Sequence, residues 1–157
     1  MAITKEEFKD ALSCFASGVT VVTTIDNDGE LHGLTVSAFC SVSLDPPLVL
    51  ICIDKGTGSY HAFEENGNFV VNFLNENQQN VSNQFASSVE DKFDGIRHTL
   101  NEYDIPVLSD SLVNLECKLK NAYDGGDHTI FIGEIFKSKV RKGKPLVYCH
   151  GKYQELD

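Results

Sequence analysis

Four hydroxyl side chains lie at odd-numbered positions of one predicted strand, over residues 33–44. Thr35, Ser37, Ser41 and Ser43 would share a face of that strand, because successive side chains point to opposite sides. The segment contains no Lys or Glu, which an exposed polar stripe usually includes. Small hydroxyls beside small apolar residues suit a flat polar heterocycle that needs close backbone approach and a few donors. A solvent-facing stripe on an edge strand is the alternative.

A second candidate is the loop over residues 54–59, between a predicted buried strand and a predicted helix. Lys55 supplies a positive charge, Thr57 and Ser59 supply hydroxyls, and the helix start supplies free N–H groups. Together these groups could cradle a phosphate. An ordinary helix-capping loop has the same composition, so both readings stay open.

His128 is a third candidate, because it follows a tight turn at residues 124–127 and begins a strand. Such a histidine can be structural or catalytic. No Gly-x-Ser-x-Gly hydrolase motif is present, and no Gly-x-Gly-x-x-Gly follows a strand. The five cysteines form no Cys-x-x-Cys pair and the five histidines form no ligand pair at helical spacing. The sequence therefore predicts reduced thiols and no metal site.

The elements that must position these residues are mostly strands. Thr4 and Glu7 form a capping box that begins a helix, with Phe8, Leu12 and Phe15 on one stripe. This helix is expected to end at Gly18. Strands are predicted over 19–25, 32–43, 48–53 (buried on both faces), 68–74, 112–123, 128–140 and 146–150. Helices are predicted over 59–66 and 78–87, and residues 88–110 should be mostly irregular. Strands in hairpin order favour an antiparallel barrel or sandwich.

Length and charge narrow the class of protein. The 157 residues suit one domain over 1–157, and a 41% hydrophobic share is typical of a globular core. A net charge of −10 disfavours nucleic acid as a partner, because there is no broad positive field to attract phosphates. No membrane span and no signal peptide are evident, so a cytoplasmic location is expected.

Seven short segments form an ordered set along the chain: FASGVTVVTT (15–24), GLTVSAFCSVSLDPPL (33–48), FVVN (69–72), NQFA (83–86), DKF (91–93), GDHTIFIGE (126–134) and GKY (151–153). With these segments the chain resembles the short-chain flavin reductase family of the FMN-binding split-barrel fold. This family includes the reductase components of two-component flavin monooxygenases. Each segment is a weak signal alone, but the ordered set is specific.

The resemblance implies a mainly β fold, a six-stranded antiparallel split barrel (Greek key) with a few short helices, and a homodimer with flavin near its interface. The residues that would face the flavin ring and ribityl chain are Thr35, Val36, Ser37, Ala38, Ser41 and Val42. Lys55, Thr57 and Ser59 would lie at the phosphate, and Phe85 and Ala86 would close the pocket. His128 would meet the nicotinamide, with Tyr153 nearby.

The function that the resemblance implies is NAD(P)H:flavin oxidoreduction. Hydride would pass from NADH or NADPH to FMN or FAD, and the reduced flavin would supply a monooxygenase partner. One alternative is an electron-transfer flavoprotein or ferric reductase with permanently bound FMN. A non-enzymatic barrel that binds a small ligand is the other.

Overall fold

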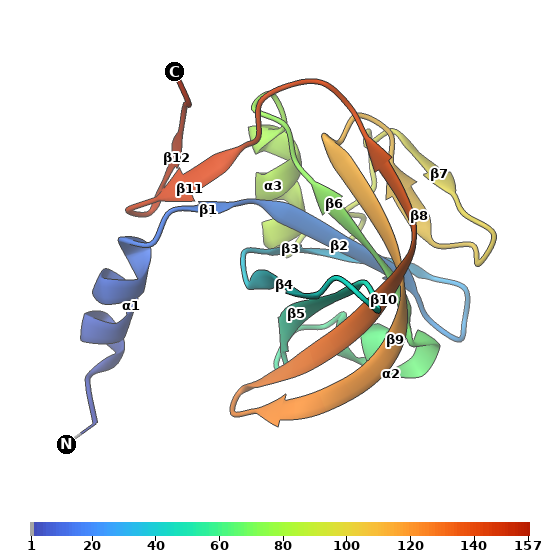
Figure 1. The fold of residues 1–157 in the computed structure, drawn as a ribbon, viewed down its shortest axis with the longest axis horizontal. Coiled ribbons are helices and arrows are strands. Elements are labelled where there is room, and N and C mark those ends of the chain that lie inside the picture. The colour runs from blue at the N-terminus through green and yellow to red at the C-terminus, as the bar shows by residue number, and fades with distance from the viewer. Residues whose placement is uncertain (1) are drawn as a thin grey trace.

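A seven-stranded antiparallel sheet dominates the computed structural model, which describes residues 2–157 (Figure 1). Its strand order is β3-β2-β6-β9-β10-β5-β4. Three helices accompany it within these residues, α1 (Lys5–Ser13), α2 (Tyr60–Asn66) and α3 (Gln79–Ala86). The strands of the main sheet are β2 (Thr20–Ile25), β3 (Leu31–Val36), β4 (Phe39–Ser43), β5 (Leu48–Asp54), β6 (Asn68–Phe73), β9 (Val113–Gly125) and β10 (His128–Val140). The mainly β class is confirmed.

The two edge strands of this sheet, β3 and β4, are consecutive in the chain and are joined by only Ser37 and Ala38. The sheet must therefore curve until its two edges meet at these residues. The prediction of one strand over 32–43 is wrong at this point, because the chain leaves the β2 ladder after Val36 and joins β5 from Phe39. Seven strands result instead of six. No ladder joins β3 to β4 within residues 2–157, so the six-stranded split barrel is not confirmed.

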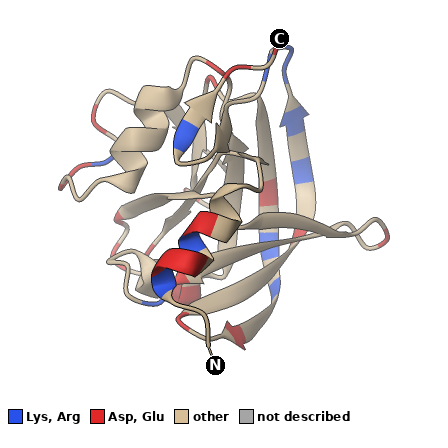
Figure 2. Ribbon diagram, turned by 90° about the vertical axis from the view of Figure 1, so that its left-hand side faces the viewer, with Lys and Arg blue, Asp and Glu red and all other residues tan. Residues whose placement is uncertain are grey.

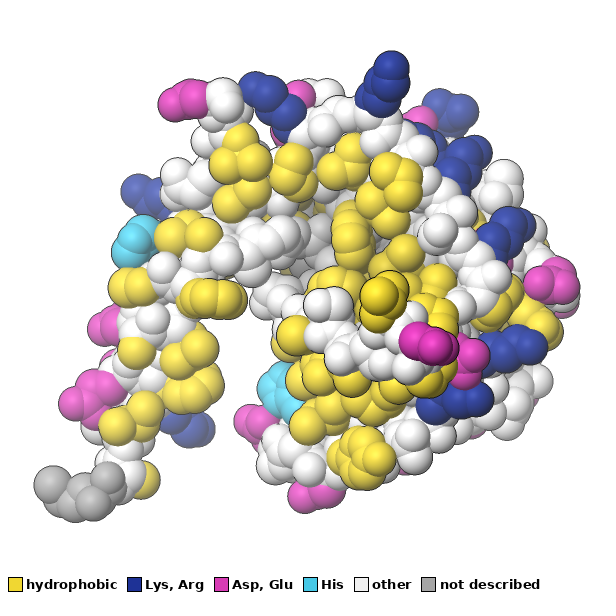
Figure 3. Space-filling view, in the orientation of Figure 1, with side chains coloured by type: hydrophobic (Ala, Val, Ile, Leu, Met, Phe, Trp, Pro, Cys, Tyr) yellow, Lys and Arg dark blue, Asp and Glu magenta, His cyan; other side chains and the backbone are white. Residues whose placement is uncertain are grey.

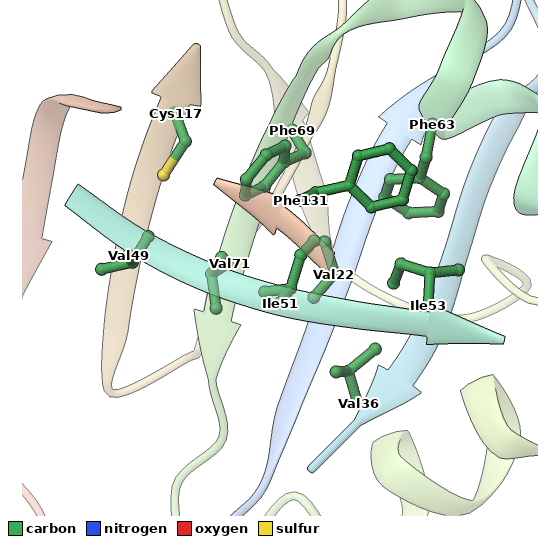
Figure 4. Close-up of a cluster of buried hydrophobic side chains, with 10 residues drawn as sticks. All are labelled: Val22, Val36, Val49, Ile51, Ile53, Phe63, Phe69, Val71, Cys117 and Phe131. Carbon is green, nitrogen blue, oxygen red and sulfur yellow. The ribbon is translucent and has the colours of Figure 1, made fainter. Parts of the chain in front are cut away.

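The main hydrophobic core lies inside the curved sheet (Figure 4). On β5 the side chains of Val49, Ile51 and Ile53 are buried, while those between them are half-buried. The prediction of a strand buried on both faces is thus wrong for β5, which alternates. The other core members come from β2, β3, β6, β9, β10 and α2, and are Val22, Val36, Phe63, Phe69, Val71, Cys117 and Phe131.

A second core lies between the sheet and α3. Phe85 of α3 is fully buried and packs with Val19, Val21 and Leu108, among others. Because β2 contributes Val21 here and Val22 to the main core, β2 is buried on both faces. This strand therefore fixes α3 beside β3, where the predicted hydroxyl stripe begins.

The N-terminal helix α1 stands away from the sheet (Figure 1). The capping box is confirmed: the Thr4 N–H donates to Glu7 Oε2 at 2.7 Å, and the Glu7 N–H donates to Thr4 Oγ1 at 3.1 Å. The helix ends at Ser13 and does not reach Gly18. Acidic and basic residues both lie along α1 (Figure 2). Phe8 and Leu12 of α1, and Phe15 just beyond its end, form an exposed apolar stripe, up to 79% exposed at Phe15; we call residues 5–15 the α1 arm. Figure 3 shows this apolar arm facing the body of the molecule across a hollow.

Small sheets complete the fold. One contains β1 (Ser17–Gly18), β11 (Val147–Cys149) and β12 (Lys152–Gln154). Another is the hairpin of β7 (His98–Leu100) and β8 (Pro106–Leu108), so the predicted irregular stretch 88–110 contains two short strands. All five cysteines are free thiols. Among the described residues, none of the helices is both long enough and apolar enough to span a bilayer.

Candidate functional site

A groove opens where the chain passes from β3 to β4. It comprises two adjoining cavities of about 430 Å³ and about 240 Å³ that share Val19 and Ser37 in their walls. We call it the Ser37 groove. Four predicted site residues lie in its wall: Thr35, Ser37, Ala86 and Tyr153. The remaining wall residues are Ser17, Gly18, Thr20, Phe39, Phe73, Leu74, Ser82, Asn83, Pro145, Leu146, Tyr148 and Gly151.

Hydrogen bonds between three elements hold one wall of the Ser37 groove. Thr35 Oγ1 donates to the Ser82 carbonyl at 2.6 Å, which fixes β3 against α3. The Tyr153 hydroxyl donates to Asn83 Oδ1 at 2.8 Å and lies 2.8 Å from Ser82 Oγ. Since a phenol has one proton, the Ser82 hydroxyl donates to Tyr153. Sequence reasoning missed Ser82 and Asn83, although Asn83 begins the NQFA motif.

The break between β3 and β4 leaves backbone donors free. The Ser37 carbonyl accepts from the Phe39 N–H at 2.9 Å, and the Ala38 carbonyl accepts from the Cys52 N–H at 3.0 Å. The N–H groups of Ser37 and Ala38 have no hydrogen-bond partner within residues 2–157, and both residues are exposed. Two backbone donors at the rim of the groove are therefore available to an acceptor on a ligand.

Other predicted residues of this segment take different positions. Val36 and Phe85 are core residues with side chains 4% and 0% exposed, so only their backbone could contact a ligand. Ser41 and Val42 lie exposed on β4, where a bulge interrupts its pairing with β5. Phe85 has a further role: an added Cβ on Gly33 would lie 2.6 Å from its ring, so glycine is required there.

A separate cavity, of about 430 Å³, lies next to the Ser37 groove, along β3 and the end of α3. Thr57 and Ser59 lie in its wall together with Lys92, and we call it the Lys92 cavity. Lys92 Nζ donates to the Phe85 carbonyl at 3.1 Å and the Gly33 carbonyl at 3.3 Å. Burial lowers the pKa of this lysine. An ammonium has three protons, so one remains for a ligand.

Lys55, the cation predicted for the phosphate, is not in the wall of the Lys92 cavity. Its Nζ is paired with Asp124 and also donates to the Gly126 carbonyl at 2.7 Å. The hydrogen bond to Asp124 raises the pKa of Lys55, and the same bond lowers the pKa of Asp124. Lys55 thus ties the end of β5 to the β9–β10 turn. Sequence reasoning missed Lys92, although it stands in the matching DKF motif.

His128 is the first residue of β10 and pairs with Asp54 of β5 and Gly125 of β9. Its Nδ1 lies 2.7 Å from Asp127 Oδ1, and this contact lowers the pKa of Asp127. The start of β10 lies at the lower left of Figure 1, whereas β12, which carries Tyr153, lies at the upper left. The structure therefore does not bring His128 and Tyr153 together within one chain.

The Ser37 groove and the Lys92 cavity together can hold an extended, mostly apolar ligand with an anionic end. The Ser37 groove offers apolar and aromatic walls together with free N–H donors, which suit a flat heterocycle with a polar edge. The Lys92 cavity offers a half-buried cation beside two hydroxyls, which suits an anion. Gly33 and Ser37 are four residues apart on the same segment, about 13 Å in an extended strand. One ligand of that length could occupy both.

Comparison with known proteins identifies the family to which the whole chain belongs. The model of the flavin reductase like domain matches residues 12–157. The reductase subunit HsaB of a flavin-dependent monooxygenase from Rhodococcus jostii is 40% identical, over 99% of this chain and 80% of its own length. The FMN reductase (NADH) SmoA of Agrobacterium fabrum is 38% identical, over 93% of this chain and 83% of its own length.

A solved structure extends the comparison to the fold. The NADH:FAD oxidoreductase SgcE6 of Streptomyces globisporus, in complex with NAD and FAD fragments, superposes with a TM-score of 0.91. It is 30% identical and is covered over 98% of its length, with all of this chain matched (100%). The chain described here therefore belongs to the flavin reductase-like domain family.

Proposed function

We propose that this protein is an NAD(P)H:flavin oxidoreductase that supplies reduced flavin to a monooxygenase component. The observation that carries the proposal is the pair of free N–H donors, on Ser37 and Ala38, beside the Ser37 groove. Relatives named as flavin reductases and as monooxygenase reductase subunits support the same activity.

The flavin ring would lie in the Ser37 groove and its phosphate in the Lys92 cavity. A bound flavin supplies the hydride-accepting ring and a reduced nicotinamide supplies the hydride. The backbone donors at Ser37 and Ala38 would then hydrogen-bond to the polar edge of the ring, where negative charge develops. Thr35 and Ala86 would contact the ring, and the exposed Ser41 and Val42 would flank its open side.

The phosphate subsite would use Lys92 with Thr57 and Ser59. Lys92 is the cation in the wall of that cavity, and its position is fixed by the Gly33 and Phe85 carbonyls. Such a local cation can hold a phosphate on a protein whose net charge is −10. A role of Lys55 at the phosphate stays a prediction and would require it to leave Asp124. Either FMN or FAD could bind in this way.

We further propose a homodimer, because the site is divided within one chain. Two residues are expected at the nicotinamide: His128 at the start of β10 and Tyr153 on β12, and Figure 1 shows these two elements well apart. The α1 arm also exposes an apolar stripe, with Phe8 55%, Leu12 54% and Phe15 79% exposed. A second copy that covered this stripe could bring its His128 toward the first copy's groove. The curved sheet would then be the expected split barrel, with β3 and β4 counted as one bent strand. The cytoplasmic location stays a prediction.

The test is the oxidation of NADH and of NADPH by the purified protein, measured at 340 nm with and without added FMN or FAD. Oxidation that requires added flavin supports a reductase with flavin as a diffusible substrate. Oxidation without added flavin, by a protein that is yellow as purified and reduces ferric iron or a partner, would favour permanently bound FMN. No nicotinamide oxidation and no flavin binding would overturn the proposal and favour a non-enzymatic ligand-binding protein.

A further inference from the structure

Three potential metal ligands meet at the end of the β2–β3 hairpin. Asp26 directly follows β2, His32 lies on β3 and His61 lies on α2. Asp26 Oδ2 is 2.9 Å from His32 Nε2 and 3.5 Å from His61 Nε2. The two imidazole rings stand edge to face, with centroids 5.0 Å apart. These three ligand atoms all lie within 4.8 Å of one another, and no other such group of three occurs within residues 2–157.

The ligand atoms are held in place by a second set of hydrogen bonds. Asp26 Oδ1 accepts the N–H groups of Asp28 at 3.0 Å and Glu30 at 2.9 Å, which leaves Oδ2 to the two histidines. His32 Nδ1 lies 3.2 Å from Ser59 Oγ. A ligating histidine commonly donates through its other ring nitrogen to an oxygen in this way, which fixes its tautomer and ring orientation.

Burial of the group is uneven, in a way that suits a bound ion. The side chains of Asp26 and His32 are 5% and 14% exposed, whereas that of His61 is 51% exposed. An ion could therefore enter from solvent on the His61 side and retain water there. With bonds of about 2.0–2.2 Å to N and O, neighbouring ligands of a tetrahedral Zn²⁺ lie about 3.3 Å apart. The two Asp26–histidine distances lie on either side of that spacing.

We propose that Asp26, His32 and His61 bind one divalent metal ion of the Zn²⁺ class, with water completing the coordination. Two imidazoles and a carboxylate favour Zn²⁺, Co²⁺ or Cu²⁺, whereas Mg²⁺ and Ca²⁺ prefer oxygen alone. The ion would link the β2–β3 turn to α2. Because His32 and Ser59 also lie in the wall of the Lys92 cavity, it would stiffen that wall. The proposal does not depend on the flavin reductase activity.

The experiment is a titration of the purified protein, freed of metal by a chelator, with Co²⁺ under visible absorption. We expect d–d bands that saturate at one Co²⁺ per chain and are displaced by Zn²⁺ but not by Mg²⁺. His61→Ala, a substitution at a half-exposed side chain, should remove the bands while the circular dichroism spectrum is unchanged. Ser59→Ala, which removes the hydroxyl that contacts His32 Nδ1, should weaken Co²⁺ binding about 10-fold or more.

A control separates this group from a contact between a thiol and an imidazole elsewhere in the structure. Cys14 Sγ lies 3.9 Å from His150 Nδ1, and Cys149 is close to the Cys14 backbone. The matched control His150→Ala should leave Co²⁺ binding unchanged. A thiolate charge-transfer band that His150→Ala removes and His61→Ala does not would overturn the proposal. So would the absence of stoichiometric Co²⁺ and Zn²⁺ binding, which would make the group a hydrogen-bonded clamp only.

Discussion

Replacement of Lys92 by methionine should weaken the binding of FMN selectively. The change keeps an unbranched stem of similar length and removes the ammonium, which donates to the Gly33 and Phe85 carbonyls and has one proton left. A hydrogen bond to a charged group is worth about 1.5–3 kcal/mol. Because Lys92 is only half-buried, the lower part of that range applies, and a loss of about 1.5–2 kcal/mol corresponds to a Kd about 10- to 30-fold higher.

The assay is a flavin fluorescence titration with FMN and with riboflavin, which lacks the phosphate. Lys92→Met should raise the Kd for FMN and leave that for riboflavin within about threefold, while Lys92→Arg should recover part of the loss. Thermal unfolding must be followed in parallel, because two carbonyls lose a donor and stability should fall by about 1 kcal/mol. Equal losses for FMN and riboflavin would refute the phosphate role. A larger loss in Lys55→Met than in Lys92→Met would place the phosphate at Lys55.

Three further predictions follow from other parts of the structure. His128→Ala should lower the nicotinamide-dependent rate, measured by steady-state kinetics, about tenfold or more. The flavin Kd, measured by titration, should change less than threefold, and equal losses in rate and affinity would contradict the role assigned to His128. Gly133→Ala should destabilise the fold by about 1–3 kcal/mol in urea unfolding, because the new Cβ would lie 2.5 Å from Phe69 Cζ. Gly18→Ala serves as the control, because a Cβ at Gly18 would have no heavy atom within 4 Å. Phe15→Asp should shift a dimer toward monomer in sedimentation velocity, and an unchanged sedimentation coefficient would rule α1 out of the interface.

Much of the fold follows from local sequence signals. The capping box and the strands before and after residues 26–31 are each specified within a few residues, and each is confirmed. The break at Ser37 was not predictable from composition, because residues 33–44 have uniform strand character. Its cause is non-local: the segment pairs with β2 on one side of the break and with β5 on the other.

The sequence predicted only part of the candidate site, because the groove also depends on contacts between distant segments. Thr35, Ser37, Ala86 and Tyr153 line one groove, and their role in binding flavin and nicotinamide stays a prediction. Lys92 and Lys55 are chemically alike, and only packing distinguishes the one that lies beside a cavity from the one that is paired with Asp124. The Asp26, His32 and His61 group was missed because helical spacing was the signal sought. The hairpin register, in which Thr24 pairs with His32, could have placed two of the three together.

The two-residue join between the edge strands has a consequence for the order of folding. The β2–β3 hairpin is local and can form early, but β4 reaches the sheet only through β5, which pairs with β10 from the far half of the chain, Leu48 opposite Glu134. Contacts between such distant segments cost loop-closure entropy and form slowly. The rim of the Ser37 groove is therefore completed only after the last long-range strands have docked. Ligand binding in this groove therefore requires the whole sheet to be assembled. A partly folded chain would not bind flavin there.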